Sequence, residues 1–384
     1  MIKIVTIVGA RPQIIKAAAL SRIIKNKFSG VIEEFIVHTG QHYDANMSQV
    51  FFEELGIPSP SFNLNIGSAS HGKQTALMIQ GIEDILFVEK PDFIVLYGDT
   101  NSTLAGAVAA AKMHIPIVHI EAGLRSFNKS MPEEINRIMC DHSSSLLFVP
   151  TPAGIKNLER EGFSTHNQPP FSSNNPGVFH CGDIMFDNLV YFSNIAEEKC
   201  SIIANLNLRN KEFILCTIHR DNNTDIPERL NAIFKAIHEV SVSRNIDVVL
   251  PLHPRTAKLL ELKLDPTLLN KVLNNKLIHL IPPVSYLEMI ALEKKSSLII
   301  TDSGGVQKEA YFFKKPLVVA RPETEWVEII NNGAGKIADA NEVALIESVN
   351  GFLDNEFPNF PAIFGDGNAA EYICNKLLEY KSQQ

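Results

Sequence analysis

Three carboxylates in the first half of the chain stand where strand-like or helical segments begin or end. Asp99 follows an apolar run that ends at Tyr97. Glu121 follows the run 117–120, and Glu133 opens a helix-like segment. Carboxylates after strands of one parallel sheet meet at one edge, where crowding and partial loss of water raise the pKa of some of them. Such groups can serve as general acid and base, although a carboxylate of this kind, taken singly, is more often a helix cap or a solvated loop residue.

A second group of residues is suited to a phosphate. Ser303, Gly304 and Gly305 follow an apolar run and open a helix. Two glycines at a helix start let a phosphate approach the backbone N–H groups, where the helix dipole favours an anion. Ser303 adds a hydroxyl donor, and Glu309, further along the helix, can accept from ribose hydroxyls. A plain helix cap with a tight turn can have the same sequence, because short glycine motifs are common.

The first strand-like run ends in the segment Gly9–Pro12, and Pro12 suits the first turn of a helix. Arg11 can direct two N–H donors at a phosphate. The GxGxxG fingerprint of dinucleotide-binding folds is missing here, because only Gly9 is present. Oxidation of a substrate by bound NAD is therefore not expected, and we predict no cofactor.

Two histidines end strand-like runs in the second half, and each has an arginine nearby. They are His219 and His253. A histidine at a strand end can hold a diphosphate or move a proton, and two at equivalent places favour an anion site over a structural role. No HxxxH or Cys/His cluster has metal-ligand spacing, so we predict no metal. Arg321 follows the last strand-like run and is a further candidate, whereas Trp326 is expected to pack.

These residues need a fold that brings them together. Strand-like runs alternate with helical stretches throughout the chain, which indicates parallel sheets covered on both faces. We predict an α/β fold with two Rossmann-like domains facing a cleft, where ligands bind beyond the carboxyl ends of the strands. The predicted strands are 4–8, 34–38, 93–97, 117–120, 146–149, 213–218, 247–252, 277–280, 297–301 and 316–320.

The composition excludes several classes of protein. The 384 residues are 45% hydrophobic and 20% charged, as in ordinary globular domains. The net charge of -8 argues against a general nucleic-acid binder, and no apolar run approaches the roughly 20 residues of a membrane span. Five scattered cysteines without a CxxC pair are typical of reduced thiols. With no signal peptide visible, we expect a cytoplasmic protein that binds neither nucleic acid nor membrane.

Five segments together resemble the UDP-N-acetylglucosamine 2-epimerase family, and the likeness runs over nearly the whole chain. They are Gly9–Pro12, Gly98–Thr103, His119–Arg125, Pro132–Arg137 and Thr301–Gly305. The resemblance implies two Rossmann-like domains of the glycosyltransferase-B type and a homodimer. We accordingly expect a domain with the carboxylates at 1–178, a UDP-binding domain at 179–365, and a helix at 366–384 that packs back on the first domain.

The resemblance also implies a reaction and its residues. A proton leaves C2 as UDP leaves C1, a 2-acetamidoglucal forms, and proton and UDP then return to give the inverted sugar. The positions that match the acid/base carboxylates are Asp99, Glu121 and Glu133. His219, also counted as catalytic, would hold the diphosphate with Arg11 as its charge develops. The residues expected to contact the UDP-sugar are Arg11, Lys16, Arg137, His253, Ser303, Gly304, Gly305, Glu309 and Arg321.

Departures from the family pattern leave more than one activity open. Gln13 stands where many members have glutamate, and the segment 324–328 reads Thr-Glu-Trp-Val-Glu instead of Thr-Glu-Arg-Pro-Glu. The segment 38–44 only partly matches one that binds an activating UDP-sugar in some members. These forms are similar to a subgroup acting on UDP-2,3-diacetamido-glucuronate, whose carboxylate needs a further cation, supplied by Arg255, Arg321 or Lys129. The same carboxylates also suit a hydrolysing epimerase, and the fold alone also suits a sugar-binding or glycosyl-transferring protein.

Overall fold

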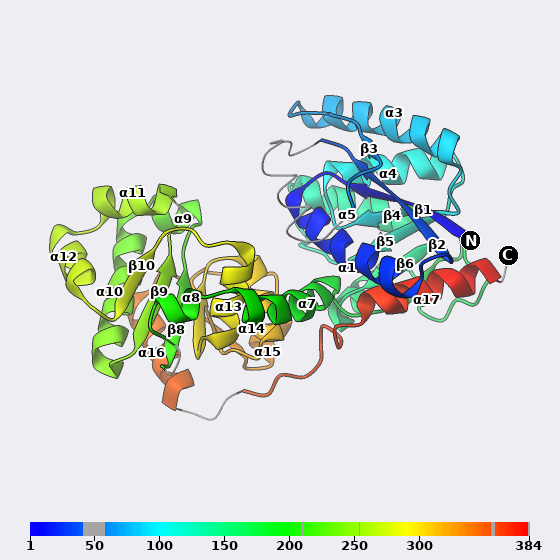
Figure 1. Ribbon diagram of the computed structural model, residues 1–384. Helices are drawn as coiled ribbons and strands as arrows, with labels where there is room; N and C mark the ends of the chain where they lie inside the picture. Colours follow the sequence, from blue (N-terminus) through cyan, green and yellow to red (C-terminus); the bar gives the residue numbers. More distant parts are fainter. Residues whose placement is uncertain (41–57, 209–210, 253, 355–357, 383–384) are drawn as a thin grey trace. The chain divides into compact units, whose positions relative to one another are not determined.

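The computed structural model describes residues 1–40, 58–208, 211–252, 254–354 and 358–382. The chain divides into two compact units. Unit 1 comprises Met1–Asn188 and Ala362–Gln384, and unit 2 comprises Leu189–Pro361. Each unit has one parallel sheet interleaved with helices (Figure 1), so the predicted α/β class with two Rossmann-like sheets is confirmed.

The described strands of unit 1 are β1 (Ile2–Val8), β2 (Ile32–His38), β3 (Phe62–Asn63), β4 (Phe93–Tyr97), β5 (Ile117–Ile120), β6 (Leu146–Val149) and β7 (Gly177–His180). They form one parallel sheet in the order β3-β2-β1-β4-β5-β6-β7. Strand β4 is wholly buried and β1 nearly so, as expected where helices cover both faces. The chain order reverses between β1 and β4, which is where ligands bind in such folds.

The described helices of unit 1 are α1 (Arg11–Lys27), α3 (His71–Glu89), α4 (Asn101–Lys112), α5 (Pro132–Ser143), α6 (Pro152–Arg160) and α17 (Ala369–Ser382), and α7 (Ile184–Lys199) begins there. The terminal helix α17, red in Figure 1, packs against α1, which is drawn in blue. Asp187 caps α17, because its carboxylate accepts from the backbone N–H groups of Ala369 (3.1 Å) and Ala370 (2.7 Å).

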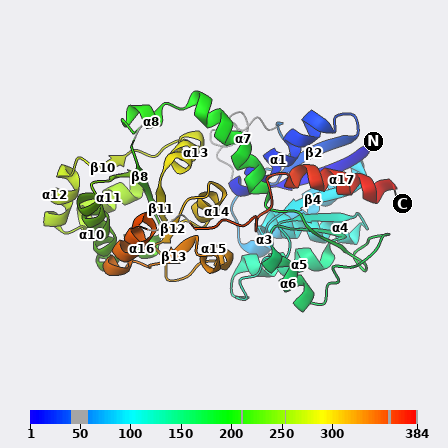
Figure 2. The ribbon, with the colours of Figure 1, turned by 90° about the horizontal axis from the view of Figure 1, so that it is seen from below.

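The described strands of unit 2 are β8 (Phe213–Thr217), β9 (Asp247–Pro251), β10 (Ile278–Ile281), β11 (Leu298–Thr301), β12 (Leu317–Val319) and β13 (Gly335–Ile337). Their order is β10-β9-β8-β11-β12-β13, so the chain order reverses between β8 and β11. The helices are α8 (Ile202–Asn205), α9 (Asp221–Thr224), α10 (Pro227–Arg244), α11 (Pro254–Lys263), α12 (Pro266–Asn274), α13 (Tyr286–Lys295), α14 (Gly304–Phe312), α15 (Val327–Asn331) and α16 (Glu342–Asp354). Figure 2 shows α10 beside α16, and these two helices pack together over the core of this sheet.

Three strands lie outside the sequence prediction. Their sequences are Phe-Asn in β3, Gly-Val-Phe-His in β7 and Gly-Lys-Ile in β13, so no run of more than two apolar residues marks them. The predicted domain limits, at residues 178 and 365, stay a prediction. The boundaries between the two compact units lie close to them, at residues 188 and 361. Within the described residues, no helix combines the length and the apolar character that crossing a bilayer requires.

Gly9 follows β1 at a point where two side chains approach the backbone. A Cβ atom there would lie 2.1 Å from Ser102 Oγ and 2.3 Å from Thr39 Oγ1, and these hydroxyls are hydrogen-bonded to each other at 2.8 Å. We expect Gly9→Ala to lower the free energy of unfolding by about 1–3 kcal/mol through overpacking, measured by denaturant titration. Gly72→Ala on α3 is the control, since a Cβ there meets no atom of the described residues within 4 Å. Equal stability of the two variants would contradict this expectation.

Candidate active site

The loops that follow β4 and β5 meet at the carboxyl edge of the unit 1 sheet. The two strands pair in parallel, so Asp99 and Glu121 lie just beyond neighbouring strand ends. Gly98 has a φ of +61°, and a Cβ there would lie 3.2 Å from Glu121 Oε2 and 3.3 Å from Lys16 Nζ. The glycine therefore provides both the turn after β4 and the room in which these side chains meet.

Glu121 forms an ion pair with Lys16, which reaches it from α1. The two side chains are 10% and 13% exposed, so most of the pair is shielded from water. Glu121 has a φ of +76°, in the left-handed region that side chains other than glycine rarely adopt. Such strain persists only where the surroundings hold it, and it clusters at functional sites. The structure thus brings two of the predicted site residues into contact.

Asp99 is held by two neighbouring residues of α5. Asp99 Oδ2 lies 2.5 Å from Arg137 Nη2. Asn136 Nδ2 donates to the Asp99 backbone carbonyl at 2.8 Å. Arg137 also contacts Glu134, at 2.9 Å. Asp99 is therefore paired with Arg137, and Glu121 is paired with Lys16.

The two glutamates at the start of α5 differ in burial. Glu133 is exposed, and among the described residues no hydrogen bond or ion pair joins it to the other predicted carboxylates. Glu134 is buried and accepts from the backbone N–H groups of residues 126 and 127, both at 2.9 Å. Burial raises the pKa of Glu134, but these bonds and Arg137 outweigh it and lower the pKa overall. Sequence reasoning missed Glu134, although its spacing of seven from Asp141 places it on the buried helix face.

Gln13 joins the loops after β1 and β4. Its side-chain oxygen accepts from the backbone N–H groups of Gly9 (2.9 Å) and Ala10 (3.1 Å). Its Nε2 donates to the Tyr97 carbonyl (2.9 Å) and to Thr103 Oγ1 (3.0 Å). An ionised glutamate has no hydrogen to give to a carbonyl, so the amide at this position has a local structural reason.

Asp302 holds the loop after β8 at the corresponding edge of unit 2. Its buried carboxylate accepts from the backbone N–H groups of His219 (3.1 Å) and Arg220 (3.0 Å) and from Asn223 Nδ2 (3.0 Å). His219 Nδ1 lies 3.1 Å from Asp302 Oδ1, and its imidazole is half exposed. Burial raises the pKa of Asp302, but His219 and the other donors outweigh it and lower the pKa overall. Sequence reasoning gave Asp302 no role, although it directly precedes Ser303.

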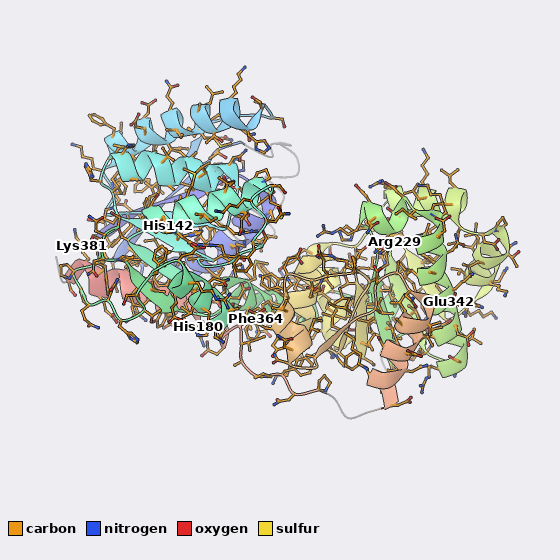
Figure 3. All side chains as sticks on the ribbon, turned by 180° about the vertical axis from the view of Figure 1, so that it is seen from behind. His142, His180, Arg229, Glu342, Phe364 and Lys381 are labelled. Atoms are coloured by element: carbon orange, nitrogen blue, oxygen red, sulfur yellow. The ribbon has the colours of Figure 1, made fainter. Side chains whose placement is uncertain are left out.

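Asn223 is fixed in turn by Arg229 of α10. Arg229 Nη2 donates to Asn223 Oδ1 at 2.9 Å, and the same guanidinium pairs with Asp339 at 2.5 Å. Figure 3 labels Arg229 on its helix. The amide that donates to Asp302 therefore has its orientation set from outside the loop.

The first turn of α14 follows Asp302 directly. Ser303 caps the helix, because its Oγ accepts from the Val306 N–H at 3.5 Å. Gly305 is exposed, and within 4 Å a Cβ there would meet only Ser303 Oγ, at 3.8 Å. A helix start that carries N–H groups without intrahelical partners favours an anion. The geometry is therefore compatible with a phosphate at Ser303–Gly305.

The segment after β12 contacts this turn from one side. Trp326 Nε1 donates to the Gly304 carbonyl at 2.9 Å, and Lys308 Nζ lies 4.5 Å from the centre of the indole ring. Arg321 forms a bidentate pair with Glu325, with distances of 2.9 and 3.0 Å. A Cβ on Gly304 would lie 3.6 Å from Glu325 Oε2. The predicted cation Arg321 thus lies next to the glycine turn, paired with a carboxylate of its own chain.

Glu309 lies on α14 near the buried Glu293 of α13. Burial and the charge of Glu309 raise the pKa of Glu293 well above its ordinary value. The ribose contact of Glu309 stays a prediction. His253 and the segment Gln41–Asp44 lie outside the described residues, and so does the side chain of Arg11, the first residue of α1.

A family model described as UDP-N-acetylglucosamine 2-epimerase matches residues 25–378 of the chain. The chain belongs to the UDP-N-acetylglucosamine 2-epimerase family. A UDP-N-acetylglucosamine 2-epimerase homolog from Methanococcus maripaludis is 48% identical over 98% of this chain and 99% of its own length. The UDP-2,3-diacetamido-2,3-dideoxy-D-glucuronate 2-epimerase of Pseudomonas aeruginosa is 45% identical, with the same shares covered.

Solved structures of an epimerase from Methanocaldococcus jannaschii match the whole fold. Its UDP-GlcNAc 2-epimerase has a TM-score of 0.85 at 40% identity, covering 98% of this chain and 100% of that chain. The same protein in complex with UDP-GlcNAc and UDP has a TM-score of 0.78 at 41% identity, with the same coverage. These matches confirm the family and the glycosyltransferase-B type of Rossmann-like fold. As a member of this epimerase family, the protein is an isomerase.

The carboxylate of Asp302 gives stability that depends on pH. Asp302→Asn loses an ionised acceptor of several buried N–H groups, so we expect a loss of about 1–3 kcal/mol at neutral pH in urea unfolding. Because the folded pKa of Asp302 is lowered, this difference is fully present above the unfolded pKa and shrinks as pH falls through the folded value. Asp354→Asn, at an exposed pair with Arg244, is the control and should change little. A difference between wild type and Asp302→Asn that grows on acidification would contradict the assignment.

Proposed function

We propose that this protein is a non-hydrolysing UDP-N-acetylglucosamine 2-epimerase, which interconverts UDP-GlcNAc and UDP-ManNAc. The observation that carries the proposal is the pair of carboxylates, Asp99 and Glu121, that follow adjacent strands, each beside a cation. Membership in the family and the complex of the M. jannaschii relative with UDP-GlcNAc and UDP support it. Carboxylates with neighbouring cations can take and give a proton where a sugar carbon is inverted.

The proposed reaction is an elimination followed by an addition. One carboxylate removes the proton from C2 while the C1–O bond breaks, and the bond electrons leave with UDP. The product of this step is a 2-acetamidoglucal with a double bond between C1 and C2. A proton then returns to C2 on the opposite face, and a phosphate oxygen of UDP adds to C1. No hydride is transferred, so in this proposal the enzyme needs no NAD.

The proposal assigns separate tasks to two groups of residues. Asp99, Glu121 and Glu133 act on the sugar, and the exposed position of Glu133 leaves its carboxylate free to approach a ligand. His219 and the turn Ser303–Gly305 bind the diphosphate, whose charge grows as the C1–O bond breaks. Asp302 helps to position His219 and the turn Ser303–Gly305, because its carboxylate accepts from the His219 backbone N–H and it directly precedes Ser303.

The remaining assignments are proposals of the same kind. They are UDP-sugar contacts for Arg11, Lys16, Arg137, His253, Gly304, Glu309 and Arg321. The homodimer and the cytoplasmic location also stay predictions. Lys16 and Arg137 have a second role in this proposal, because each holds the charge of an acid/base carboxylate in place.

A second candidate substrate is UDP-2,3-diacetamido-2,3-dideoxy-D-glucuronate. The relative that bears this name is 45% identical over 98% of this chain, and the Thr-Glu-Trp-Val-Glu segment is similar to that subgroup. The extra carboxylate of this sugar needs a cation. Arg255 is paired with Asp221 and Asp225, and Arg321 is paired with Glu325, whereas Lys129 is exposed in unit 1 and has no ion pair among the described residues. Lys129 is therefore the residue we propose for that contact.

Loss of the acid/base groups should stop proton transfer. We expect Asp99→Asn, Glu121→Gln and Glu133→Gln each to lower turnover by about 10²- to 10⁴-fold, because each removes a group that gives or takes the C2 proton. Proton transfer is measured as deuterium incorporation at C2 from heavy water. The affinity for UDP, measured by calorimetry, should be the same as in the wild type. Glu83→Gln on the exposed side of α3 is the control with wild-type turnover. Full activity of Glu121→Gln would remove the basis of the proposal.

The products of the reaction show which UDP-sugar is the substrate and whether the enzyme hydrolyses it. With UDP-GlcNAc followed by NMR, we expect UDP-ManNAc to accumulate to a constant ratio without release of free sugar. Free ManNAc together with UDP would instead establish a hydrolysing enzyme. Turnover of the 2,3-diacetamido uronate with no turnover of UDP-GlcNAc would establish the second candidate.

A further inference from the structure

His119 is a fully buried histidine in β5 that lies outside the proposed set of catalytic and binding residues. Its Nδ1 lies 2.6 Å from Asp141 Oδ1, and its Nε2 lies 2.8 Å from the carbonyl oxygen of Gly98. A carbonyl oxygen can only accept, and an ionised carboxylate can only accept. Both ring nitrogens therefore carry a hydrogen, which makes the side chain an imidazolium cation.

The surroundings of this pair agree with that protonation state. Burial lowers the pKa of His119, but the neighbouring Cys140 and Asp141 outweigh it and raise the pKa well above its ordinary value. Burial likewise raises the pKa of Asp141, but His119 and Arg125 outweigh it and lower the pKa. The result is an ion pair in which neither side chain is exposed to water.

The second oxygen of Asp141 reaches the next loop. Asp141 Oδ2 accepts from the Gly123 backbone N–H at 3.1 Å and pairs with Arg125 Nη1 at 2.7 Å. Gly123 has a φ of +77°, and a Cβ there would lie 2.6 Å from the Gly154 carbonyl oxygen. This turn is therefore tightly enclosed at the point where Asp141 holds it.

Arg125 continues the network outward. Its Nε and Nη2 donate to the two oxygens of Glu161, each at 2.7 Å. His142, labelled in Figure 3, lies 3.3 Å from Glu161 Oε2. The charges alternate in sign from His119 through Asp141 and Arg125 to Glu161. Removal of one buried member leaves its partner uncompensated, so the network acts as a unit.

One carboxylate thus connects the two loops that carry the proposed acid/base groups. Asp141 binds the backbone two residues after Glu121 directly. Through His119 it binds the carbonyl of Gly98, the residue before Asp99. Neither member of the pair needs to approach a ligand for this connection, because both contacts are to the backbone.

We propose that the buried His119–Asp141 pair is a positioning element that sets the distance between the Asp99 loop and the Glu121 loop. The inference rests on the proposed function, since it assumes that these two carboxylates act on the sugar. A pair that only stabilises the fold would change the amount of folded enzyme and leave the rate constant of each folded molecule unchanged. A positioning pair changes that rate constant, because a misplacement of about 1 Å can lower a rate by about 10²-fold.

The kinetic test uses His119→Gln, whose amide can still donate to the Gly98 carbonyl but carries no charge for Asp141. We expect kcat per folded molecule to fall by about 10- to 100-fold while KM stays within about threefold of wild type. The matched control is His279→Gln in unit 2. His279 Nε2 lies 2.6 Å from Asp247 Oδ1, and within the described residues His279 has no hydrogen bond or ion pair with a proposed site residue. The control should keep the wild-type kcat. A wild-type kcat for His119→Gln overturns the proposal.

A second measurement needs no variant and no activity. In ¹⁵N NMR of the wild-type protein at about pH 8, above the ordinary pKa of histidine, His119 should keep both ring nitrogens protonated. A neutral His119 ring under these conditions overturns the proposal. Absence of C2 isotope exchange in the wild type would instead defeat the proposed function, and the NMR result would still decide the state of the pair.

Discussion

A carboxylate stays ionised inside a protein only where hydrogen-bond donors replace the water that it has lost. Each unit places such a group at the carboxyl edge of its sheet. In unit 1 Asp141 binds His119 and the Gly123 backbone, and in unit 2 Asp302 binds the backbone of His219 and Arg220. In both units the buried charge connects loops from two neighbouring strands, so the shape of the edge depends on this charge being satisfied.

The partly exposed charges have a different arrangement. Asp99 and Glu121 are each paired with a cation and remain within reach of solvent, whereas the buried carboxylates Asp141 and Asp302 have several donors among the described residues. A fully satisfied carboxylate has no lone pair to offer a substrate, while one held from a single side still has acceptor capacity. This contrast fits our proposal that Asp99 and Glu121 exchange protons with a sugar, whereas Asp141 and Asp302 hold the loops in place.

The sequence was sufficient for the fold because long apolar runs such as 93–97 and 213–217 are buried on both faces and alternate with helices. It was insufficient for β3, β7 and β13, which contain no more than two consecutive apolar residues each. Within the site, the positions of Asp99, Glu121 and the turn Ser303–Gly305 could be predicted, because each closely follows a strand that the sequence indicates. The residues that form ion pairs and hydrogen bonds with them could not be predicted. Pairs such as Lys16–Glu121 and His119–Asp141 join positions far apart in the chain, and nothing in local spacing indicates them.

Trp326 is the one tryptophan among the 384 residues, and its indole N–H donates to the Gly304 carbonyl in the first turn of α14. Light emitted after excitation of tryptophan therefore originates from a single point, next to the helix start that we assign to phosphate. The Lys308 ammonium against the ring makes that emission sensitive to any redistribution of charge nearby. The protein thus contains its own optical reporter for events at this turn, with no label to attach.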